Sequence, residues 1–459
     1  MRIILKNFRL VDEDTDMRGG VVIENGVIAE ILPASGDCQI EKDAALVIDG
    51  SHFCGDALPV LMPAFVDLHA HFRDSGLTGK EHELPSEVLE SASLAAAAGG
   101  FTTVVCMANT KPVTDTFEKA ASIRARCDAL GLVDLYPVIS LTKGMEGKEI
   151  SEITALPSLN RTKDGVSIPL MLSEDGKDLA DDDLFLAAMR EAKRIGIPIS
   201  CHCEFGGEEA EASKKAGQPR KTWSRIEENN ATRRAIELGK KAGCHIHIAH
   251  VSTKEAAEAI RHAKAEARQR HGLHGDFILT CEAMPHNLCL TEETAEKLGG
   301  ESWGRVNPPL RHEDDRQALI RAVADGTIDA IATDHAPHRN ADKETGSPGF
   351  SAFETAFAAA FTELARPCAP TAKPVIDLKR LSFLMSANPA RLIGLGGDAG
   401  RGRILPGMRA DLVIVDTERS WNVNPAAFKT RGKNSPFAGM EIFGKILMTF
   451  REGRMVFCA

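Results

Sequence analysis

The sequence predicts an α/β protein: a (β/α)8 barrel beside a small β-sandwich domain that both chain ends build. From about residue 65, short β-branched apolar runs alternate with amphipathic stretches rich in Ala, Glu, Lys and Arg, which is typical of parallel βα units. Both ends show instead short alternating runs broken by turn signals such as Gly19-Gly20 and Asn25-Gly26. The 459 residues accommodate both parts, because a barrel takes about 250 residues as one domain.

Eight runs have the composition of parallel barrel strands. They cover residues 65–72, 102–109, 134–141, 167–175, 198–204, 245–252, 277–283 and 328–336. The clearest helices between them are expected over residues 182–195, 230–242, 253–271 and 314–324, and the last ends at the stop signal Asp325-Gly326. Eight parallel strands joined by helical crossovers close into a barrel.

The two chain ends are each too short to bury a core of their own. We therefore expect residues 1–60 and 396–459 to pair into one small β domain, beside a barrel domain of residues 61–395.

Composition narrows the class of protein. Hydrophobic residues at 43% and charged residues at 26% are ordinary for a globular protein and exclude a disordered or fibrous chain. The net charge of −10, without a long basic run, argues against nucleic acid and anionic membrane as partners. No apolar run reaches the ~18 residues of a membrane span. The start of the chain lacks a signal-peptide pattern, and eleven scattered cysteines favour reduced thiols, so we expect a cytoplasmic enzyme.

Histidines or carboxylates terminate five of the predicted strands. His69 and His71 are two residues apart on the first strand, so their side chains share one face. The fourth, fifth, sixth and eighth strands end in Glu174-Asp175, His202, His250 and Asp334. An isolated His-x-His pair is a weak signal. Because barrel active sites form at the carboxyl ends of the strands, the repeated pattern predicts a metal site there.

Two strands leave an alternative open, because neighbouring side chains point to opposite faces. Either His202 or the thiols of Cys201 and Cys203 face the barrel interior. On the sixth strand His250 is better placed than His245 and His247, which have the opposite parity. Imidazole with carboxylate suits Zn²⁺, and also Mn²⁺, Co²⁺ or Fe²⁺, whereas an all-cysteine zinc site is disfavoured because no Cys-x-x-Cys pair occurs.

Several motifs also carry a family resemblance that covers essentially the whole chain. They are HAHFR at 69–73, AAAAGGFTTVVCMANTKPVTD at 95–115, SEDG at 173–176, VNPPLR at 306–311, ATDHAPH at 332–338, NPARLIGL at 388–395, GMRADLVIVD at 407–416 and the closing TRGKNSPFAGMEIFGKI. In this order they resemble the dihydroorotases, in their longer bacterial form, which belong to the amidohydrolase superfamily.

The resemblance implies one or two zinc ions and a set of ligands. The ligands would be His69, His71, His202, His250 and Asp334, with Asp175 bridging two ions and Glu174 as the neighbouring candidate for that bridge. Hydantoinases, allantoinases and some dihydroorotases use a carboxylated lysine on the fourth strand instead. That strand, SIPLMLSED, contains no lysine here, and Lys177 lies beyond it, which counts against those relatives.

The resemblance also implies a substrate site. Arg73, Asn109 and His338 would bind the substrate carboxylate, and Asn307 would contact its ring. A guanidinium holds a carboxylate bidentately, so the chemistry agrees. Gly349-Phe350 is expected over the pocket, and the charged, Gly- and Ser-containing segment 339–348 is the expected mobile loop.

The implied reaction is the reversible, zinc-dependent cyclisation of N-carbamoyl-L-aspartate to L-dihydroorotate in pyrimidine biosynthesis. Asp334 would take the proton from the attacking water and pass it to the leaving ring nitrogen. A homodimer and association with aspartate transcarbamoylase are the implied partners. The alternatives are a hydantoinase, dihydropyrimidinase or allantoinase, and a non-catalytic subunit that supports aspartate transcarbamoylase. The chain departs from the family pattern in a longer loop after Glu81 and in Pro285-His286-Asn287, where a double histidine is more common.

Overall fold

A computed structural model describes residues 1–34, 44–53, 57–74, 86–157, 161–162, 165–166, 168–204, 224–269, 277–369, 371–397 and 400–459. The predicted loop after Glu81 lies outside the described residues. Within them, no helix is long and apolar enough to cross a membrane.

The barrel contains all eight predicted strands. They are β6 (Phe65–Ala70), β7 (Phe101–Cys106), β8 (Asp134–Pro137), β11 (Leu172–Ser173), β12 (Ile199–Cys201), β13 (His245–Ile248), β14 (Ile278–Ala283) and β15 (Ala330–Ile331). β6 to β8 form one parallel sheet and β11 to β15 another. Parallel bridges between Ile139 and Leu172 and between Ala70 and His335 join the two sheets into a ring. The prediction of a (β/α)8 barrel is confirmed.

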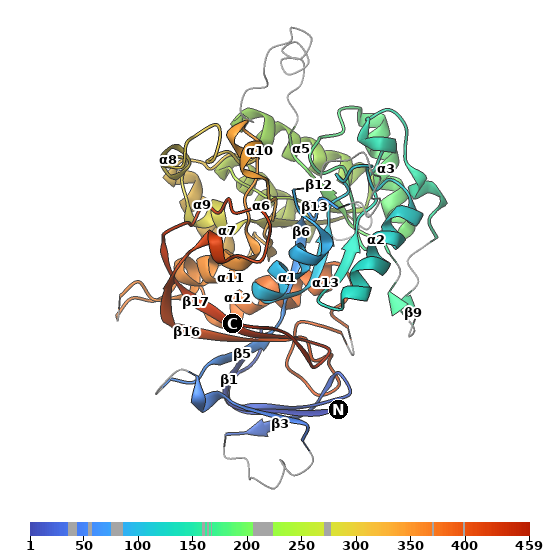
Figure 1. Cartoon of the computed structure of the whole chain (residues 1–459). Helices are drawn as coiled ribbons and strands as arrows, with labels where there is room; N and C mark the ends of the chain where they lie inside the picture. The colour runs from blue at the N-terminus through green and yellow to red at the C-terminus, as the bar shows by residue number, and fades with distance from the viewer. Residues whose placement is uncertain are drawn as a thin grey trace.

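Helices surround this ring, as Figure 1 shows. The longer ones are α1 (Leu89–Ala98), α2 (Phe117–Leu130), α3 (Asp182–Ile195), α5 (Arg225–Ala242), α6 (Lys254–Gln269), α9 (Glu313–Ala324) and α11 (Phe353–Ala360). Shorter ones are α7 (Pro285–Cys289), α8 (Glu292–Lys297), α10 (Asn340–Glu344), α12 (Leu378–Ser382) and α13 (Asn388–Leu392). α5 begins five residues before its predicted start, because Ser224 and Glu227 form a capping box there.

The chain ends build a second sheet, which lies at one end of the barrel in Figure 1. Its strands run in the order β18 (Arg454–Cys458), β17 (Glu441–Arg451), β16 (Leu412–Asn422), β5 (Val60–Pro63), β1 (Arg2–Val11), β2 (Asp16–Glu24) and β3 (Val27–Pro33), with β4 (Leu46–Asp49) paired to β1. β5 pairs with the N-terminal β1 on one side and with the C-terminal β16 on the other. The prediction that both ends share one β unit is confirmed.

A shared apolar core and one charge network join the barrel to the terminal sheet. Val413 and Val415 of β16 and Ile446 of β17 lie in the same buried core as Phe65 of β6 and Phe357 of α11. At the start of β8, Asp134 accepts hydrogen bonds from Arg451 of the terminal sheet at 2.6 Å and from Arg401, and Arg409 lies 2.5 Å away. The carboxylate therefore connects the barrel to the terminal sheet.

Candidate metal centre

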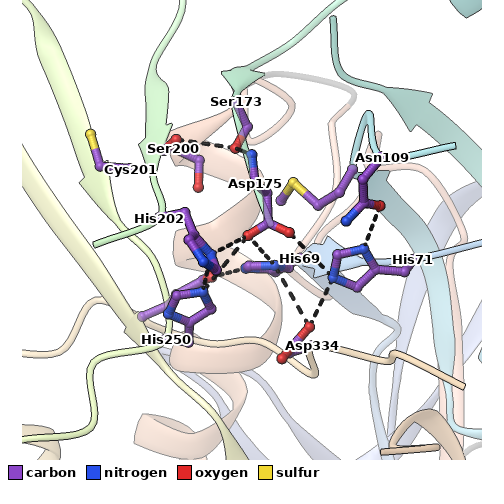
Figure 2. A network of polar contacts seen from close by, with 12 residues as sticks. His69, His71, Asn109, Ser173, Asp175, Ser200, Cys201, His202, His250 and Asp334 are labelled. Carbon is purple, nitrogen blue, oxygen red and sulfur yellow. Dashed lines mark hydrogen bonds and ion pairs between the residues drawn. The ribbon is translucent and has the colours of Figure 1, made fainter. Parts of the chain in front are cut away.

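The predicted metal ligands lie at or just beyond the carboxyl ends of their strands and point toward one another, as Figure 2 shows. His69 is inside β6, whereas His202 follows β12 directly. The backbone of His250 (φ 33°) and of Asp334 (φ 44°) is left-handed, which non-glycine residues seldom adopt. These turns end the regular strands earlier than predicted. Such strained backbone is concentrated at functional sites.

Asp175 lies at the centre of the group. Its Oδ1 is 2.9 Å from His202 Nδ1, 3.2 Å from His69 Nε2 and 3.7 Å from His250 Nε2. Its Oδ2 is 3.5 Å from His71 Nε2. All of these side chains are buried.

Asp334 lies on the other side of the same histidines. Its Oδ1 is 3.0 Å from His71 Nε2 and 3.7 Å from His69 Nε2. Two groups of three side chains therefore each have ligand atoms within 4.8 Å of one another, and His69 belongs to both groups. One group is His69, His71 and Asp334, and the other is His69, Asp175 and His250. This arrangement suits one shared ion or a pair.

The hydrogen bonds of the two strand-one histidines test whether a cation fits. His69 Nδ1 lies 2.8 Å from Glu282 Oε1, and His71 Nδ1 lies 2.9 Å from Asn109 Oδ1, so in each ring Nδ1 carries the proton. Each Nε2 is then an acceptor facing carboxylate oxygens. His69 Nε2 is buried and has no hydrogen-bond partner within the described residues. Opposed acceptors at this range need a positive charge between them, either a proton shared with the carboxylate or a metal ion, and nitrogen with oxygen donors suits Zn²⁺ and similar ions.

The electrostatics keep both aspartates in the ligand form. Burial by itself raises the pKa of Asp175, but the charges of His69 and His202 outweigh it and hold that pKa well below its ordinary value. Burial also raises the pKa of Asp334. The hydrogen bond with His71 and the charges of the nearby histidines outweigh burial, so this pKa too lies below its ordinary value. Both carboxylates are ionised at neutral pH.

The alternatives left open by the sequence have clear positions in the structure. Glu174 accepts hydrogen bonds from the backbone N–H groups of Leu141 (2.8 Å) and Thr142 (3.1 Å), so Asp175 is the carboxylate that contacts the histidines. His245 and His247 both lie 2.9 Å from the Thr280 hydroxyl, away from Asp175.

On strand five, His202 contacts Asp175, whereas Cys201 and Cys203 are buried in the hydrophobic core. The histidine is therefore the side chain that faces the barrel interior.

Two carboxylates behind the histidines were missed by the sequence reasoning. Glu282 of β14 lies 2.8 Å from His69 Nδ1 and 3.1 Å from His247 Nε2, and Glu204 lies 3.0 Å from His202 Nε2. Such partners orient metal-binding imidazoles and fix their tautomer. The available signal was an acid in the apolar strand sequence FILTCEA.

The predicted carboxylate-binding residues lie beside this group. Arg73 Nη2 is 3.4 Å from His338 Nε2, and Arg73 Nε is buried without a hydrogen-bond partner in the described part of the chain. Burial, and then the charge of Arg73, lowers the pKa of His338 to about 3, so its imidazole is neutral. Asn109 is linked to the histidine–aspartate group by its hydrogen bond with His71. The Oδ1 of Asn307 is also buried without a partner among the described residues, but no contact links it to the others.

Comparisons with known proteins agree over the whole chain. The model of the Amidohydrolase family matches residues 60–456. A dihydroorotase of Clostridium botulinum is 38% identical over 455 residues, covering 99% of both chains, and one of Aquifex aeolicus is 34% identical over 468 residues, covering 100% of this chain and 99% of the other. Among solved structures, L-hydantoinase from Arthrobacter aurescens has a TM-score of 0.78 at 25% identity, covering 99% of this chain and 95% of the other.

D-hydantoinase from Thermus sp. has the same TM-score, 0.78, at 23% identity, covering 99% of this chain and 94% of the other. At this identity the likeness establishes only a shared fold. The family model matches, the relatives are full-length, and the strand ends of the barrel carry the expected histidines and aspartates. The relatives at 38% and 34% identity are dihydroorotases, and this chain belongs to the amidohydrolase family.

Proposed function

We propose that this enzyme is a dihydroorotase, which interconverts N-carbamoyl-L-aspartate and L-dihydroorotate in pyrimidine biosynthesis. The observation that carries the proposal is the Arg73–His338 pair beside the histidine–aspartate group, at 3.4 Å. The Arg73 guanidinium suits the free carboxylate that distinguishes this substrate from hydantoin and dihydrouracil. The one N–H of the neutral His338 ring, at Nε2, donates to Pro348 O in this structure and would turn to the substrate as the second donor.

The proposed cofactor is Zn²⁺, one or two ions per chain. The ligands would be His69, His71, His202, His250 and Asp334, with Asp175 between two ions. When bound, such an ion lowers the pKa of water from 15.7 toward ~7 and polarises a carbonyl oxygen.

Side chains of the protein transfer the proton and bind the substrate. In ring opening, a water oxygen bonds to the ring carbonyl carbon and the carbon–nitrogen amide bond breaks. Asp334, ionised by its contact with His71, accepts the proton of that water and gives it to the leaving nitrogen. Arg73, Asn109 and His338 hold the substrate carboxylate, and Asn307 contacts the ring. Cyclisation reverses these steps.

The rival functions are less well supported. The hydantoinases among the solved structures share the fold at 25% identity or less, whereas the dihydroorotase relatives reach 38% and 34%. Asp175, which contacts the histidines, would serve in place of the carboxylated lysine implied for hydantoinases. A purely structural subunit would not need the complete ligand set. We also propose a cytoplasmic homodimer that associates with aspartate transcarbamoylase, which agrees with the free thiols of the described cysteines.

The direct test is the ultraviolet absorbance of dihydroorotate mixed with purified, zinc-supplemented protein. Hydantoin and dihydrouracil serve as control substrates, and each assay is repeated after chelation. We expect loss of dihydroorotate alone, abolished by the chelator. Turnover of hydantoin or dihydrouracil instead would establish a different cyclic amidohydrolase, and no turnover with bound metal would support the non-catalytic subunit.

The role of Asp334 is tested by Asp334→Asn. Because the amide cannot accept the proton, kcat is expected to fall about 10²- to 10⁴-fold, while dihydroorotate still binds. Binding is measured by calorimetry and the metal content by elemental analysis, since Asp334 is also a proposed ligand. A variant that retains its metal and a nearly normal kcat would contradict the proton-transfer role.

A further inference from the structure

A lysine without any exposed surface lies in the segment that the sequence presents as a mobile loop. Lys343 of α10 is 0% exposed. Its ammonium donates three hydrogen bonds, all to backbone carbonyls: Arg305 O at 2.8 Å, Ser347 O at 2.9 Å and Gly349 O at 3.1 Å. The Phe350 ring lies 5.4 Å from the same nitrogen.

Burying this ammonium by itself lowers the stability of the fold. Lysine is seldom fully buried, and its charge loses solvation in the interior. Burial, and then the charge of Arg305, lowers the pKa of Lys343 to about 7. An apolar side chain of similar length would avoid this penalty, as replacements of other buried charges show. The three donated bonds satisfy the ammonium completely, which indicates that it is used to fix the three carbonyls.

Those carbonyls belong to the two loops that carry proposed substrate-binding residues. Arg305 lies two residues before Asn307, so the first bond anchors the Asn307 loop. Ser347 and Gly349 flank Pro348, whose carbonyl oxygen is 2.7 Å from His338 Nε2. The other two bonds therefore anchor the peptide that orients His338.

The backbone at Gly349 needs such an anchor. Its φ is 137°, and a Cβ built there would lie 2.6 Å from both the Cβ and the carbonyl oxygen of Ala336. The loop thus packs directly against the strand end that follows Asp334. The N–H group of Gly349 also donates to Arg305 O at 3.1 Å. The loop that holds Asn307 and the loop that orients His338 therefore meet at the carbonyl oxygen that Lys343 binds.

We propose that Lys343 is a positioning residue for substrate binding: its ammonium cross-links the 305–307 and 347–349 loops and so sets the positions of Asn307 and His338. The inference rests on the proposed function only in assigning substrate contacts to those two residues. The three acceptors of Lys343 are distinct from the proposed metal ligands, so metal binding and proton transfer are independent of the cross-link.

The test compares Lys343→Met, which keeps the length and removes the charge, with Lys343→Gln, whose amide retains two donors. For Lys343→Met we expect KM for dihydroorotate to rise about tenfold, the size expected for a lost buried hydrogen-bonding group. We expect kcat to change less than about threefold and the metal content to stay constant, which separates binding from catalysis. Lys343→Gln should be intermediate. Lys297→Met, an exposed lysine of α8, is the matched control.

Amide hydrogen exchange without substrate tests the cross-link separately from the reaction. In both variants the amides of residues 305–307 and 338–350 should exchange faster, whereas those of β6 and β13 should not. If the wild-type protein fails to turn over dihydroorotate, the proposed function fails, but the exchange result still decides the cross-link. An unchanged KM, or unchanged exchange in the two loops, would overturn the proposal. Failure of both variants to fold would also overturn it, because the ammonium would then support the whole barrel.

Discussion

At the scale of single residues, the metal-facing histidines depend on partners behind them. Glu282 is buried, and although burial raises its pKa, the contacts with His247 Nε2 at 3.1 Å and with His69 bring that pKa down to about 2. It is therefore a full negative charge held against His69 Nδ1 at 2.8 Å. This contact keeps the proton on Nδ1 and leaves Nε2 free to bind a cation.

Glu282→Gln is expected to weaken zinc binding about 10- to 100-fold, the usual effect of losing such a partner. The neutral amide no longer enforces the tautomer of His69 and leaves His247 without its charged partner. Equilibrium dialysis against buffered zinc measures the change. Glu293→Gln, at an exposed position of α8, is the control and should bind zinc like the wild type. Equal zinc affinity in Glu282→Gln and the control would remove Glu282 from the centre.

At the scale of elements, the sequence predicts the strands well because their apolar, β-branched composition is local information. It also predicts which strand ends carry the ligands. It misses the left-handed turns at His250 and Asp334, because no residue preference favours them there. It misses Glu282 and Lys343 because a carboxylate or lysine is ordinarily exposed, and only the assembled barrel buries them.

A further element that the sequence could not place is the segment before β17. Asn434 of this segment donates to Gly349 O at 2.8 Å, and its Oδ1 accepts from the His338 N–H group at 3.2 Å. The contact joins residues 96 positions apart, so no local pattern reveals it. A segment that leaves the terminal sheet thus supports the same loop as Lys343, and both side chains donate to the Gly349 carbonyl oxygen.

Asn434→Ala is accordingly expected to raise KM for dihydroorotate about threefold to tenfold, because each lost hydrogen bond contributes ~1 kcal/mol to holding the loop. The kcat and zinc content should stay close to those of the wild type. Steady-state kinetics over a range of dihydroorotate concentrations measure both parameters, with exposed Asn422→Ala as the control. A drop in kcat at constant KM would contradict this account and place the residue nearer to the chemistry.

At the scale of the whole molecule, the barrel and the terminal sheet are joined through a buried carboxylate. Asp134 is 1% exposed and contacts Arg401, Arg409 and Arg451, which come from the C-terminal part of the chain. Burial raises its pKa, but the charges of these three arginines prevail and hold the pKa far below its ordinary value. The carboxylate stays ionised over the whole working range of pH.

Asp134→Asn should lower the free energy of unfolding by about 3 kcal/mol near neutral pH, because a buried counter-charge of Arg401, Arg409 and Arg451 is lost. This is the lower end of the range for a broken buried pair, since Asp411 still pairs with Arg401 and Arg409. The pH dependence follows from the direction of the pKa shift. Since the folded pKa is depressed, the contribution of Asp134 is complete above the unfolded pKa of about 3.9 and is lost as the pH falls toward the folded value. The difference between wild type and variant should therefore be constant from about pH 8 to pH 5 and shrink below about pH 4.

Urea unfolding of both proteins at several pH values measures this difference, and the subtraction removes the titration of groups that the two share. Asp128→Asn is the matched control, since Asp128 pairs with Arg124 at 2.9 Å but is 43% exposed. An exposed pair of this kind contributes at most ~1 kcal/mol. A loss no larger than that of the control, or one that disappears already near pH 6, would show that the arginines do not depend on Asp134. The barrel and the terminal sheet would then be joined mainly by apolar packing, such as that of Val413 and Val415 of β16 in the same buried core as Phe65.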